Sequence, residues 1–567
     1  MESFDRKGAQ LATQAIERIY ITMRHLFNRG FYKPMGVSGT TLRESLLQLN
    51  PEIYGSINEE KVELNGLLYV LDRLPKGIEE CSIINLTGDE GYRNSKIQPI
   101  IPPKRRRNCY RIDSDQMNIE ITRGRSDIYD ILTHLTFVFI ESHKIAKRVV
   151  INESGELSQE WKKFEKAVLS EDLTTQEQEV AIVHAANIIG RTFEEVKTIA
   201  LQVSEQSDPI RFLRIIYWLG KLAIQEYLDK EKRLILFSPV LRERLGHHIH
   251  GEKWAKNIKS ILQKEALTDR KIHVISANMH SVLNCLYAKQ ALPKLSLDKK
   301  RLAVYEFLSS KEGQPFHQDV LSFAEKNGLI QYIDDSGSNI DVQIIDLKKV
   351  NMADSFIGEE LSCFSLDDVI IVMDYAFGEQ AFETMDELLK PINKTPDNLL
   401  LMQVSSISIM GKAGVLTGDK GDIMVPKAHV FEGTSDNYPF INQLSVEDFH
   451  GHDISVFGGH MITVLGTSLQ NKKMLRYFKN SSWQVTGLEM EGAHYQKAIQ
   501  AASKVRGYID PNVKIRYAYY ASDNPLETGS TLASGGLGLT GVKPTYLITT
   551  KILKQILSGD ESARNSN

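Results

Sequence analysis

The sequence predicts an α/β protein in which a mainly α-helical N-terminal domain precedes a C-terminal domain built on a mixed β-sheet. Two observations lead to this fold class. Residues 1–300 repeat apolar side chains three and four positions apart, which is the period of an amphipathic helix. Residues 356–560 carry short apolar runs rich in β-branched residues with helix-like segments between several of them, a pattern typical of an α/β sheet.

The predicted helices of the first part lie in AIERIYITMRHLF, DIYDILTHLTFVFIESHKIA and DPIRFLRIIYWLGKLAIQEYL. Proline and charge interrupt the apolar rhythm at ALPKLSLDKK, which we expect to be the domain linker. Residues 301–355 hold one strand candidate, NIDVQIIDLKKV, and are predicted to connect the two parts. The predicted strands of the last part are DDVIIVMDY, NLLLMQVSSISIM, HMITVLGT, WQVTGLEM and KIRYAYYASD.

Composition excludes several classes of protein. A chain of 567 residues is too long for one hydrophobic core, so two or three domains are expected. With 68 Lys and Arg against 72 Asp and Glu, the net charge of −4 favours neither nucleic acid nor an anionic membrane as a partner. The one basic run, Lys104–Arg107, is expected to be a solvated loop.

The cysteines predict a reducing environment. Cys81, Cys109, Cys285 and Cys363 are far apart and form no CxxC pair, which indicates neither a zinc site nor a disulfide framework. The N-terminus MESFDRKGAQ lacks an apolar signal core, and no apolar run reaches the ~18 residues of a membrane span. We therefore expect a cytoplasmic protein without a membrane partner.

Two histidine-containing segments predict no metal site. Asp127, His134 and Glu141 recur every seven residues on one helical face, but ligands seven apart cannot chelate as an i, i+4 pair does. A half-buried histidine with polar neighbours is the expected outcome. The run His247–His250 is expected to be a polar loop.

Three segments of the second part carry candidate chemistry. In IMGKAGVLTGDKGDIMVP the predicted strand ends at Met410. Gly411, Gly414, Gly418 and Gly421 then open a loop that either approaches a ligand or makes a tight connection. In LEMEGA, Glu489 and Glu491 share a face if the strand continues, and either lie at a solvated end or meet a hydroxyl-bearing ligand. In YYASDNPLETG, Asp523 follows a strand as a catalytic acid or as a turn former.

These three segments, in this order, resemble the nucleoside phosphorylase and nucleosidase superfamily, whose members break the N-glycosidic bonds of nucleosides. The resemblance covers about residues 365 to 560. Within the superfamily, ASDNPLETG is most similar to the corresponding segment of AMP nucleosidases, which also carry an extra N-terminal domain. The helical part of this chain fits that arrangement but shows no matching motif.

The resemblance implies roles for individual residues. Glu491 would accept hydrogen bonds from the ribose hydroxyls, Met490 would pack against the sugar, and Asp523 would share a proton with purine nitrogen 7. Further candidate substrate-binding residues in the same motifs are Glu489, Gly411, Lys412, Gly414, Ser522 and Asn524.

The acceptor of the sugar stays open at this point. Nucleosidases of the superfamily activate water with a carboxylate just after the first strand, where DDVIIVMDYAFGEQAF offers Asp374 and Glu379, and we take Glu379 as the candidate. Lys412 occupies a position at which many relatives have a small residue. It would hold inorganic phosphate, hold the phosphate of a nucleotide, or be a solvated loop residue.

The predicted function is hydrolysis of the N-glycosidic bond of a purine nucleotide or nucleoside, with AMP-like substrates favoured. The alternatives are phosphorolysis, which would require inorganic phosphate, and a nucleotide sensor that binds without turnover. No metal or other cofactor is expected for hydrolysis. The expected partner is a small molecule rather than nucleic acid, and the resemblance implies a homo-oligomer.

Overall fold

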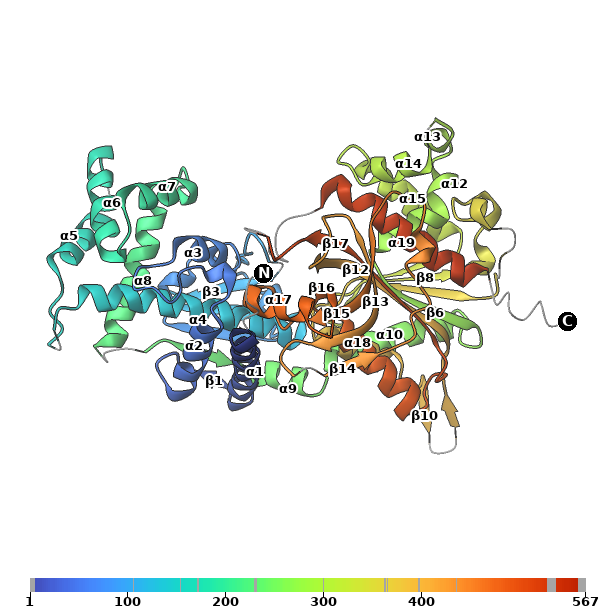
Figure 1. Cartoon of the computed structure of the whole chain (residues 1–567), viewed down its shortest axis with the longest axis horizontal. Helices are drawn as coiled ribbons and strands as arrows, with labels where there is room; N and C mark the ends of the chain where they lie inside the picture. The colour runs from blue at the N-terminus through green and yellow to red at the C-terminus, as the bar shows by residue number, and fades with distance from the viewer. Residues whose placement is uncertain are drawn as a thin grey trace. The chain divides into compact units, whose positions relative to one another are not determined.

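The computed structural model contains two compact units (Figure 1). The N-terminal unit consists of Asp5–His247 together with Ser468–Met474, and the C-terminal unit is made mainly of His248–Thr467 and Leu475–Asn567. The predicted boundary near residue 300 thus lies inside the C-terminal unit. The described residues are 6–105, 107–152, 154–170, 173–228, 232–298, 300–361, 364, 366–395, 398–434, 436–527 and 537–558.

The N-terminal unit is mainly helical, as predicted, but it also contains a β-sheet. Its longer helices are α1 (Arg6–Arg29), α2 (Val37–Leu49), α3 (Leu64–Leu71), α4 (Gly124–Val149), α5 (Gln159–Val168), α6 (Thr175–Ile189), α7 (Phe193–Val203), α8 (Arg211–Tyr227) and α9 (Pro239–Gly246). In the described residues, the strands β1 (Phe31–Tyr32), β2 (Ile83–Thr87), β3 (Cys109–Asp113), β4 (Gln116–Glu120) and β5 (Leu234–Phe237) form a five-stranded sheet in the order β1-β5-β2-β4-β3.

Helix α4 is buried along almost its whole length, including the ionisable side chains of Asp127, Asp130, His134, Glu141, His143 and Lys144. Arg107, from the run predicted to be solvated, lies 2.7 Å from Asp127 and 2.9 Å from Asp130, and Arg105 also contacts Asp130 at 2.9 Å. His134 is fully buried and lies within 3.0 Å of the Tyr54 hydroxyl. The expectation of a solvated basic run is confirmed for Lys104, which is exposed, and Arg106 lies outside the described residues. It was wrong for Arg105 and Arg107, which neutralise carboxylates of this buried helix.

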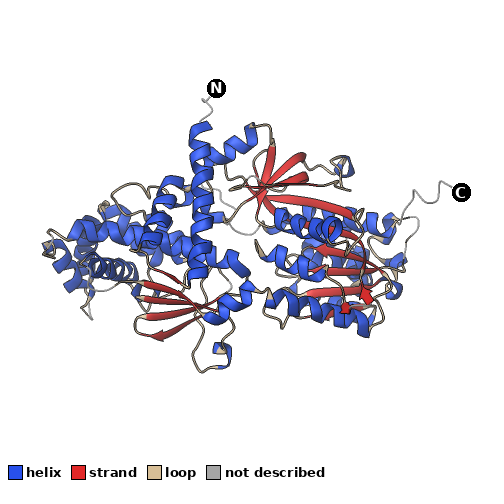
Figure 2. Ribbon diagram, turned by 90° about the horizontal axis from the view of Figure 1, so that it is seen from below, coloured by secondary structure: helices blue, strands red, loops and turns tan. Residues whose placement is uncertain are grey.

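The C-terminal unit is built on one mixed sheet, which confirms the predicted fold class (Figures 1 and 2). Within the described residues the sheet has ten strands. Nine run in the order β14-β13-β15-β16-β12-β6-β9-β8-β7, and the tenth, β17, pairs with both β12 and β13. Their bounds are β6 (Lys271–Ser276), β7 (Leu329–Tyr332), β8 (Val342–Asp346), β9 (Val369–Met373), β12 (Gln403–Val415), β13 (Ile423–Phe431), β14 (Asn437–Pro439), β15 (Val456–Thr463), β16 (Val485–Glu489) and β17 (Lys514–Asp523). A separate hairpin joins β10 (Asn393–Thr395) and β11 (Asn398–Leu400).

Helices cover both faces of this sheet, as the side chains of β9 illustrate. Val369, Ile371 and Met373 join a buried cluster with α10 (Ile249–Lys264), α16 (Gln380–Leu388) and α18 (Gly492–Gln500). Ile370 and Val372 face the opposite cluster. The helices of that opposite face include α11 (Met279–Leu283), α14 (Arg301–Leu308), α15 (His317–Lys326) and α19 (Val542–Leu557). Because β9 is buried on both faces, its sequence is an unbroken apolar run.

Two sequence expectations about this unit were wrong. The strand β6 was assigned to the helical part, although it lies between β12 and β9 in the centre of the sheet. Residues 301–355 were expected to act as a connector, yet they supply α14, α15, β7 and β8 to the same unit. The remaining short helices of the unit are α12 (Lys289–Ala291), α13 (Pro293–Asp298) and α17 (Lys472–Asn480).

The described residues contain no cluster of three or more His, Cys, Asp or Glu side chains suited to a metal ion. Nor does that part of the chain contain a helix with the length and apolar character needed to cross a membrane. Cys81, Cys109 and Cys285 are buried free thiols, whereas Cys363 lies outside the described residues.

Candidate active site

Strand β12 brings two of the three candidate motifs together. Its residue Gly414 pairs with Asp523 of β17 on one side and with Leu488 of β16 on the other. Adjacent strands lie about 4.8 Å apart, so the backbones of β17 and β16, with β12 between them, are roughly 10 Å apart. The ASD and LEMEG motifs therefore lie on either side of one strand.

The glycine-rich segment was predicted to be a loop after Met410. It instead remains in β12 as far as Val415. Gly411 pairs with Tyr519 inside the sheet. The true turn follows, with Gly418 and Gly421 at φ values of +112° and +96°. A side chain is strained in this left-handed region, so these two glycines, rather than Gly411 and Gly414, are the ones that the turn requires.

Asp523 is the last residue of β17 and is buried. Its Oδ1 lies 2.5 Å from the Ser522 hydroxyl, which is also within 3.1 Å of the Ala413 carbonyl. Asn524 serves the turn that follows, because its side-chain oxygen accepts a hydrogen bond from the Leu526 N–H at 3.1 Å. The chain thus has an Asx turn as well as a buried carboxylate, but they belong to different residues. The glycine- and serine-rich segment after Glu527 lies outside the described residues.

Glu489 and Glu491 do not share a strand face, because β16 ends at Glu489 and Glu491 is already the N-cap residue of α18. The Glu489 carboxylate accepts hydrogen bonds from the Thr463 hydroxyl at 2.5 Å, from the Glu491 N–H at 2.6 Å and from the Gly492 N–H. Burial and the neighbouring Glu491 carboxylate raise the pKa of Glu489 to about 8. Its acceptor sites are therefore used within the protein, where they hold the start of α18.

The Glu491 carboxylate accepts a hydrogen bond from the Gly378 N–H at 2.9 Å. Burial raises the pKa of Glu491 to about 7, and the backbone N–H groups and the Lys412 ammonium oppose that shift. Met490, beside it, is 8% exposed. The charge of Glu491 therefore changes with pH close to neutrality.

A fourth carboxylate near these strand ends, Glu432, was missed in the sequence. It follows β13, is buried, and accepts a hydrogen bond from the Leu465 N–H at 2.5 Å. Burial raises its pKa to about 8. Nothing in the local sequence, VFEGT, distinguishes Glu432 from an exposed strand-end glutamate.

The predicted water-activating carboxylates do not follow the first strand of the sheet. That strand is β6, and the residues directly after it, 277–283, contain no Asp or Glu. Asp374 and Glu379 instead follow β9, which pairs with β6 in parallel. Asp374 is nonetheless close to the end of β6, since the Ala277 N–H donates to the Met373 carbonyl at 3.1 Å. Glu379 lies at the N-cap of α16, near His494.

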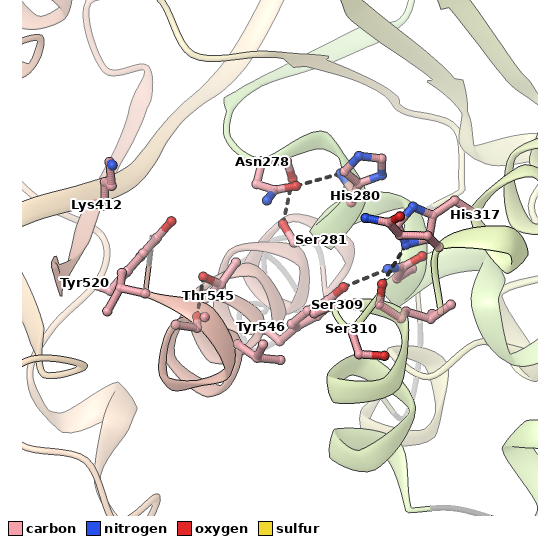
Figure 3. A pocket seen from close by; sticks show the side chains of 17 residues that line it. Asn278, His280, Ser281, Ser309, Ser310, His317, Lys412, Tyr520, Thr545 and Tyr546 are labelled. Atoms are coloured by element: carbon pink, nitrogen blue, oxygen red, sulfur yellow. Dashed lines mark hydrogen bonds between the residues drawn. The ribbon is translucent and has the colours of Figure 1, made fainter. Parts of the chain in front are cut away.

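A cavity of about 340 Å³ opens beside the end of β6 (Figure 3). Sequence analysis missed its residues from the turn after β6 and from α14 and α15. The alternating β-branched run KIHVIS followed by the polar turn ANMHS was the available signal. The cavity is lined by Asn278, His280, Ser281, Asn284, Leu308, Ser309, Ser310, Gln314, His317, Lys412, Tyr520, Leu537, Gly538, Gly541, Val542, Thr545 and Tyr546.

Comparison of the sequence with protein families gives one match. A family described as "Family of unknown function (DUF6909)" matches residues 40–293 and 302–558. A search of the curated proteins gives no match. The family match thus extends over both units of the chain.

Solved structures that are similar to this chain cover about half of it. A 5′-methylthioadenosine/S-adenosyl homocysteine nucleosidase from Campylobacter jejuni is 11% identical with a TM-score of 0.30, over 50% of this chain and 97% of that one. A futalosine hydrolase mutant from Helicobacter pylori is 12% identical with a TM-score of 0.28, over 50% and 99% of the two chains. A uridine phosphorylase from Schistosoma mansoni is 13% identical with a TM-score of 0.30, over 51% and 87%.

Proposed function

The chain belongs to the DUF6909 family of proteins of unknown function, and from its own site we propose that it hydrolyses the N-glycosidic bond of a purine nucleotide or nucleoside. The observation that carries the proposal is the placement of Asp523 and Glu491 near the ends of β17 and β16, the two strands that flank Gly414 of β12. A proton donor for the base and an acceptor for the sugar hydroxyls are what cleavage of this bond requires.

Asp523 is proposed to protonate the leaving base. A purine leaves poorly as an anion, and a proton on nitrogen 7 makes it a neutral leaving group. Support comes from the burial of the Asp523 carboxylate and from the Ser522 hydroxyl 2.5 Å away, which fixes its orientation. A fixed, partly desolvated carboxyl group transfers a proton at a defined position.

Glu491 is proposed to bind the ribose hydroxyls, and Met490 to pack against the sugar. Hydrogen bonds from the hydroxyls to an ionised Glu491 would strengthen as positive charge develops on the sugar in the transition state. Glu489 is then a positioning residue, because its hydrogen bonds to the Glu491 and Gly492 N–H groups hold the chain that carries Glu491.

For the attacking water, the residues at the end of β9 are the proposed source of a base. Asp374 lies next to the end of the first strand, whereas Glu379 lies one turn further along the chain. Phosphorolysis is the second candidate. It is favoured by the missing carboxylate after β6 and by a neighbouring cavity whose lining, as far as the structure describes it, has no acidic side chain. AMP-like substrates are favoured by the resemblance of ASDNPLETG to AMP nucleosidases.

The test is incubation of the full chain with a panel of purine and pyrimidine nucleotides and nucleosides, with and without inorganic phosphate, followed by chromatography of the free base. Release that is independent of phosphate supports hydrolysis, and release that requires phosphate supports phosphorolysis. Saturable binding without release of any base would contradict both and would support a nucleotide sensor.

A further inference from the structure

The cavity beside β6 has one chemical property that the proposed hydrolysis does not use: among the described residues that line it, none is acidic. Two histidines, one lysine and several hydroxyl and amide groups line it instead. Figure 3 shows Lys412 and His317 at opposite ends of this lining, with Tyr520 near Lys412 and His280 near His317. The cavity therefore has a lysine end and a histidine end.

The serine hydroxyls of the cavity are already committed to the backbone. Ser281, Ser309 and Ser310 each donate to a carbonyl of a preceding residue at 2.7 to 2.8 Å. These hydroxyls retain lone pairs but have no second proton to donate to a ligand. At the histidine end, an anion can therefore receive hydrogen bonds from the two imidazoles and from the side-chain amides of Asn278 and Gln314, and of these only the imidazoles can carry a positive charge.

The two imidazole rings are close together and one of them is fixed. Their centroids lie 5.2 Å apart, and His317 Nε2 donates to the Leu308 carbonyl at 2.6 Å, so Nδ1 of His317 is left for another partner. Burial and the neighbouring His317 ring lower the pKa of His280, which Asp374 partly offsets. An anion between the rings would offset the repulsion that lowers the pKa of His280.

The lysine end connects the cavity to the proposed sugar site. Lys412 pairs in the sheet with Tyr520, which lies three residues before Asp523. The positive charge of the Lys412 ammonium lowers the pKa of the buried Glu491 carboxylate. A ligand whose sugar is held by Glu491 would thus have its next substituent directed into the cavity. The volume of about 340 Å³ is ample for a phosphoryl group and its linkage to the sugar.

We propose that the histidine end of this cavity binds a phosphoryl group through His280 and His317. The inference rests on the proposed function, because the sugar site defines which end of the cavity the substrate enters. The shared chemistry is that of a phosphate oxyanion, supplied either as the 5′-phosphate of a nucleotide or as free inorganic phosphate. In the first case the cavity sets the preference of the site for nucleotides over nucleosides.

The experiment compares AMP, adenosine and inorganic phosphate on the full chain and on the double variant His280→Asn/His317→Asn. Calorimetry measures binding of each probe, and base release gives kcat/KM. Loss of charge-assisted hydrogen bonds predicts about 10- to 100-fold weaker binding of AMP and an equal fall in its kcat/KM, with adenosine unchanged. The matched control is His450→Asn, an exposed histidine of the same unit, which should behave as the wild type.

The arms separate the two sources of phosphate. A wild type that prefers AMP to adenosine, with the preference lost in the double variant, identifies the 5′-phosphate. A wild type that cleaves adenosine only with inorganic phosphate, with a raised KM for phosphate in the double variant, identifies the free ion. Lys412→Met, at the other end, should retain the discrimination between AMP and adenosine in either case.

Two further outcomes distinguish this proposal from the proposed function. If no base is released but AMP still binds more tightly than adenosine in a histidine-dependent manner, the phosphoryl site stands and the reaction is wrong. If the double variant, with unchanged circular dichroism and Tm, binds AMP and inorganic phosphate as the wild type does, the phosphoryl site is refuted whatever the reaction.

Discussion

At the scale of single residues, three carboxylates of the candidate site differ in the groups to which they are hydrogen-bonded. Glu489 is engaged with three donors of the protein, Glu491 with the Gly378 N–H, and Asp523 with the Ser522 hydroxyl. These environments predict three different responses to the same chemical change, from carboxylate to amide.

Asp523→Asn keeps the shape of the side chain but removes the transferable proton. The expected result is a fall in kcat of about 10²- to 10⁴-fold, the range for loss of a general acid, with substrate binding largely retained. Single-turnover base release and equilibrium binding of the substrate measure the two effects separately. Full activity in a properly folded Asp523→Asn variant would remove the proposed mechanism.

Glu491→Gln should weaken both binding and turnover, because its hydrogen bonds to the ribose are present in the ground state and strengthen in the transition state. A 2′-deoxy substrate should lose most of the same advantage in the wild type and should be affected little by Glu491→Gln. Glu489→Gln serves as the matched control and should be the mildest change of the three. Equal kinetic losses in the Glu489 and Glu491 variants would contradict the assigned roles.

The pH dependence of the reaction should report Glu491. Since burial raises its pKa to about 7, the carboxylate is protonated below that value and cannot accept both ribose hydroxyls. The value of kcat/KM should therefore rise with pH through about 7, with a limiting slope of about tenfold per pH unit on the acid side. Because Lys412 lowers this pKa, Lys412→Met should move the midpoint upward. A midpoint that does not respond to Lys412→Met would assign the profile to another group.

At the scale of elements, helix α4 shows how buried charge is tolerated in the N-terminal unit. Although burial alone would raise it, the Arg105 guanidinium and His134 hold the pKa of Asp130 well below its usual range. The ionised carboxylate thus stabilises the fold at neutral pH. That contribution is lost as pH falls from the ordinary aspartate range of about 4 toward the lower folded pKa.

Asp130→Asn should destabilise the N-terminal unit by about 3–5 kcal/mol, because it leaves the partly buried Arg105 without its carboxylate partner and Arg107 with Asp127 alone. Hydrogen exchange of α4 peptides in the full chain measures the change within this unit. Asp89→Asn is the control, since the Asp89 side chain is 57% exposed and lies 3.8 Å from Arg244, a pair worth less than about 1 kcal/mol. Equal protection in both variants would show that the buried ion pairs contribute nothing net.

The elements also show what the sequence could and could not predict. The apolar run of β9 and the alternation around the LEMEG and ASD motifs identify strands locally, and the order of the motifs predicted which strand ends carry carboxylates. The place of β6 could not be assigned in the same way, because KIHVIS is flanked by helical sequence and its partners lie about 100 and 130 residues away. The role of Arg107 depends on charges on α4, which a local reading of a basic run does not include.

Sequence reasoning reaches only part of the candidate site, for the same reason. Asp523, Glu491 and Lys412 belong to motifs of consecutive residues, whereas His280 and His317 come from two elements that only the folded sheet and its covering helices bring to one cavity. A histidine beside a strand end has no distinguishing sequence signal unless the strand itself is recognised first.

At the scale of the whole molecule, the division at His247/His248 predicts which fragments fold. A fragment of residues 248–567 retains every strand of the ten-stranded sheet described above, whereas residues 301–567 lack β6 and would leave β12 and β9 without their shared neighbour. The longer fragment should give a cooperative thermal transition and the shorter one should aggregate. Circular dichroism melting of both fragments checks this, and a stable, soluble 301–567 fragment would contradict the central place of β6.

The short segment Ser468–Met474 has a consequence for the order in which the protein is made. It belongs to the N-terminal unit, where the Glu52 N–H donates to the Gln470 carbonyl at 3.0 Å and the Asn471 amide donates to the Leu49 carbonyl at 2.7 Å. A ribosome adds about 5–20 residues per second, so this segment emerges on the order of ten to forty seconds after His247. During synthesis, the N-terminal unit therefore stays incomplete until the part of the C-terminal unit that precedes Ser468 has also been made.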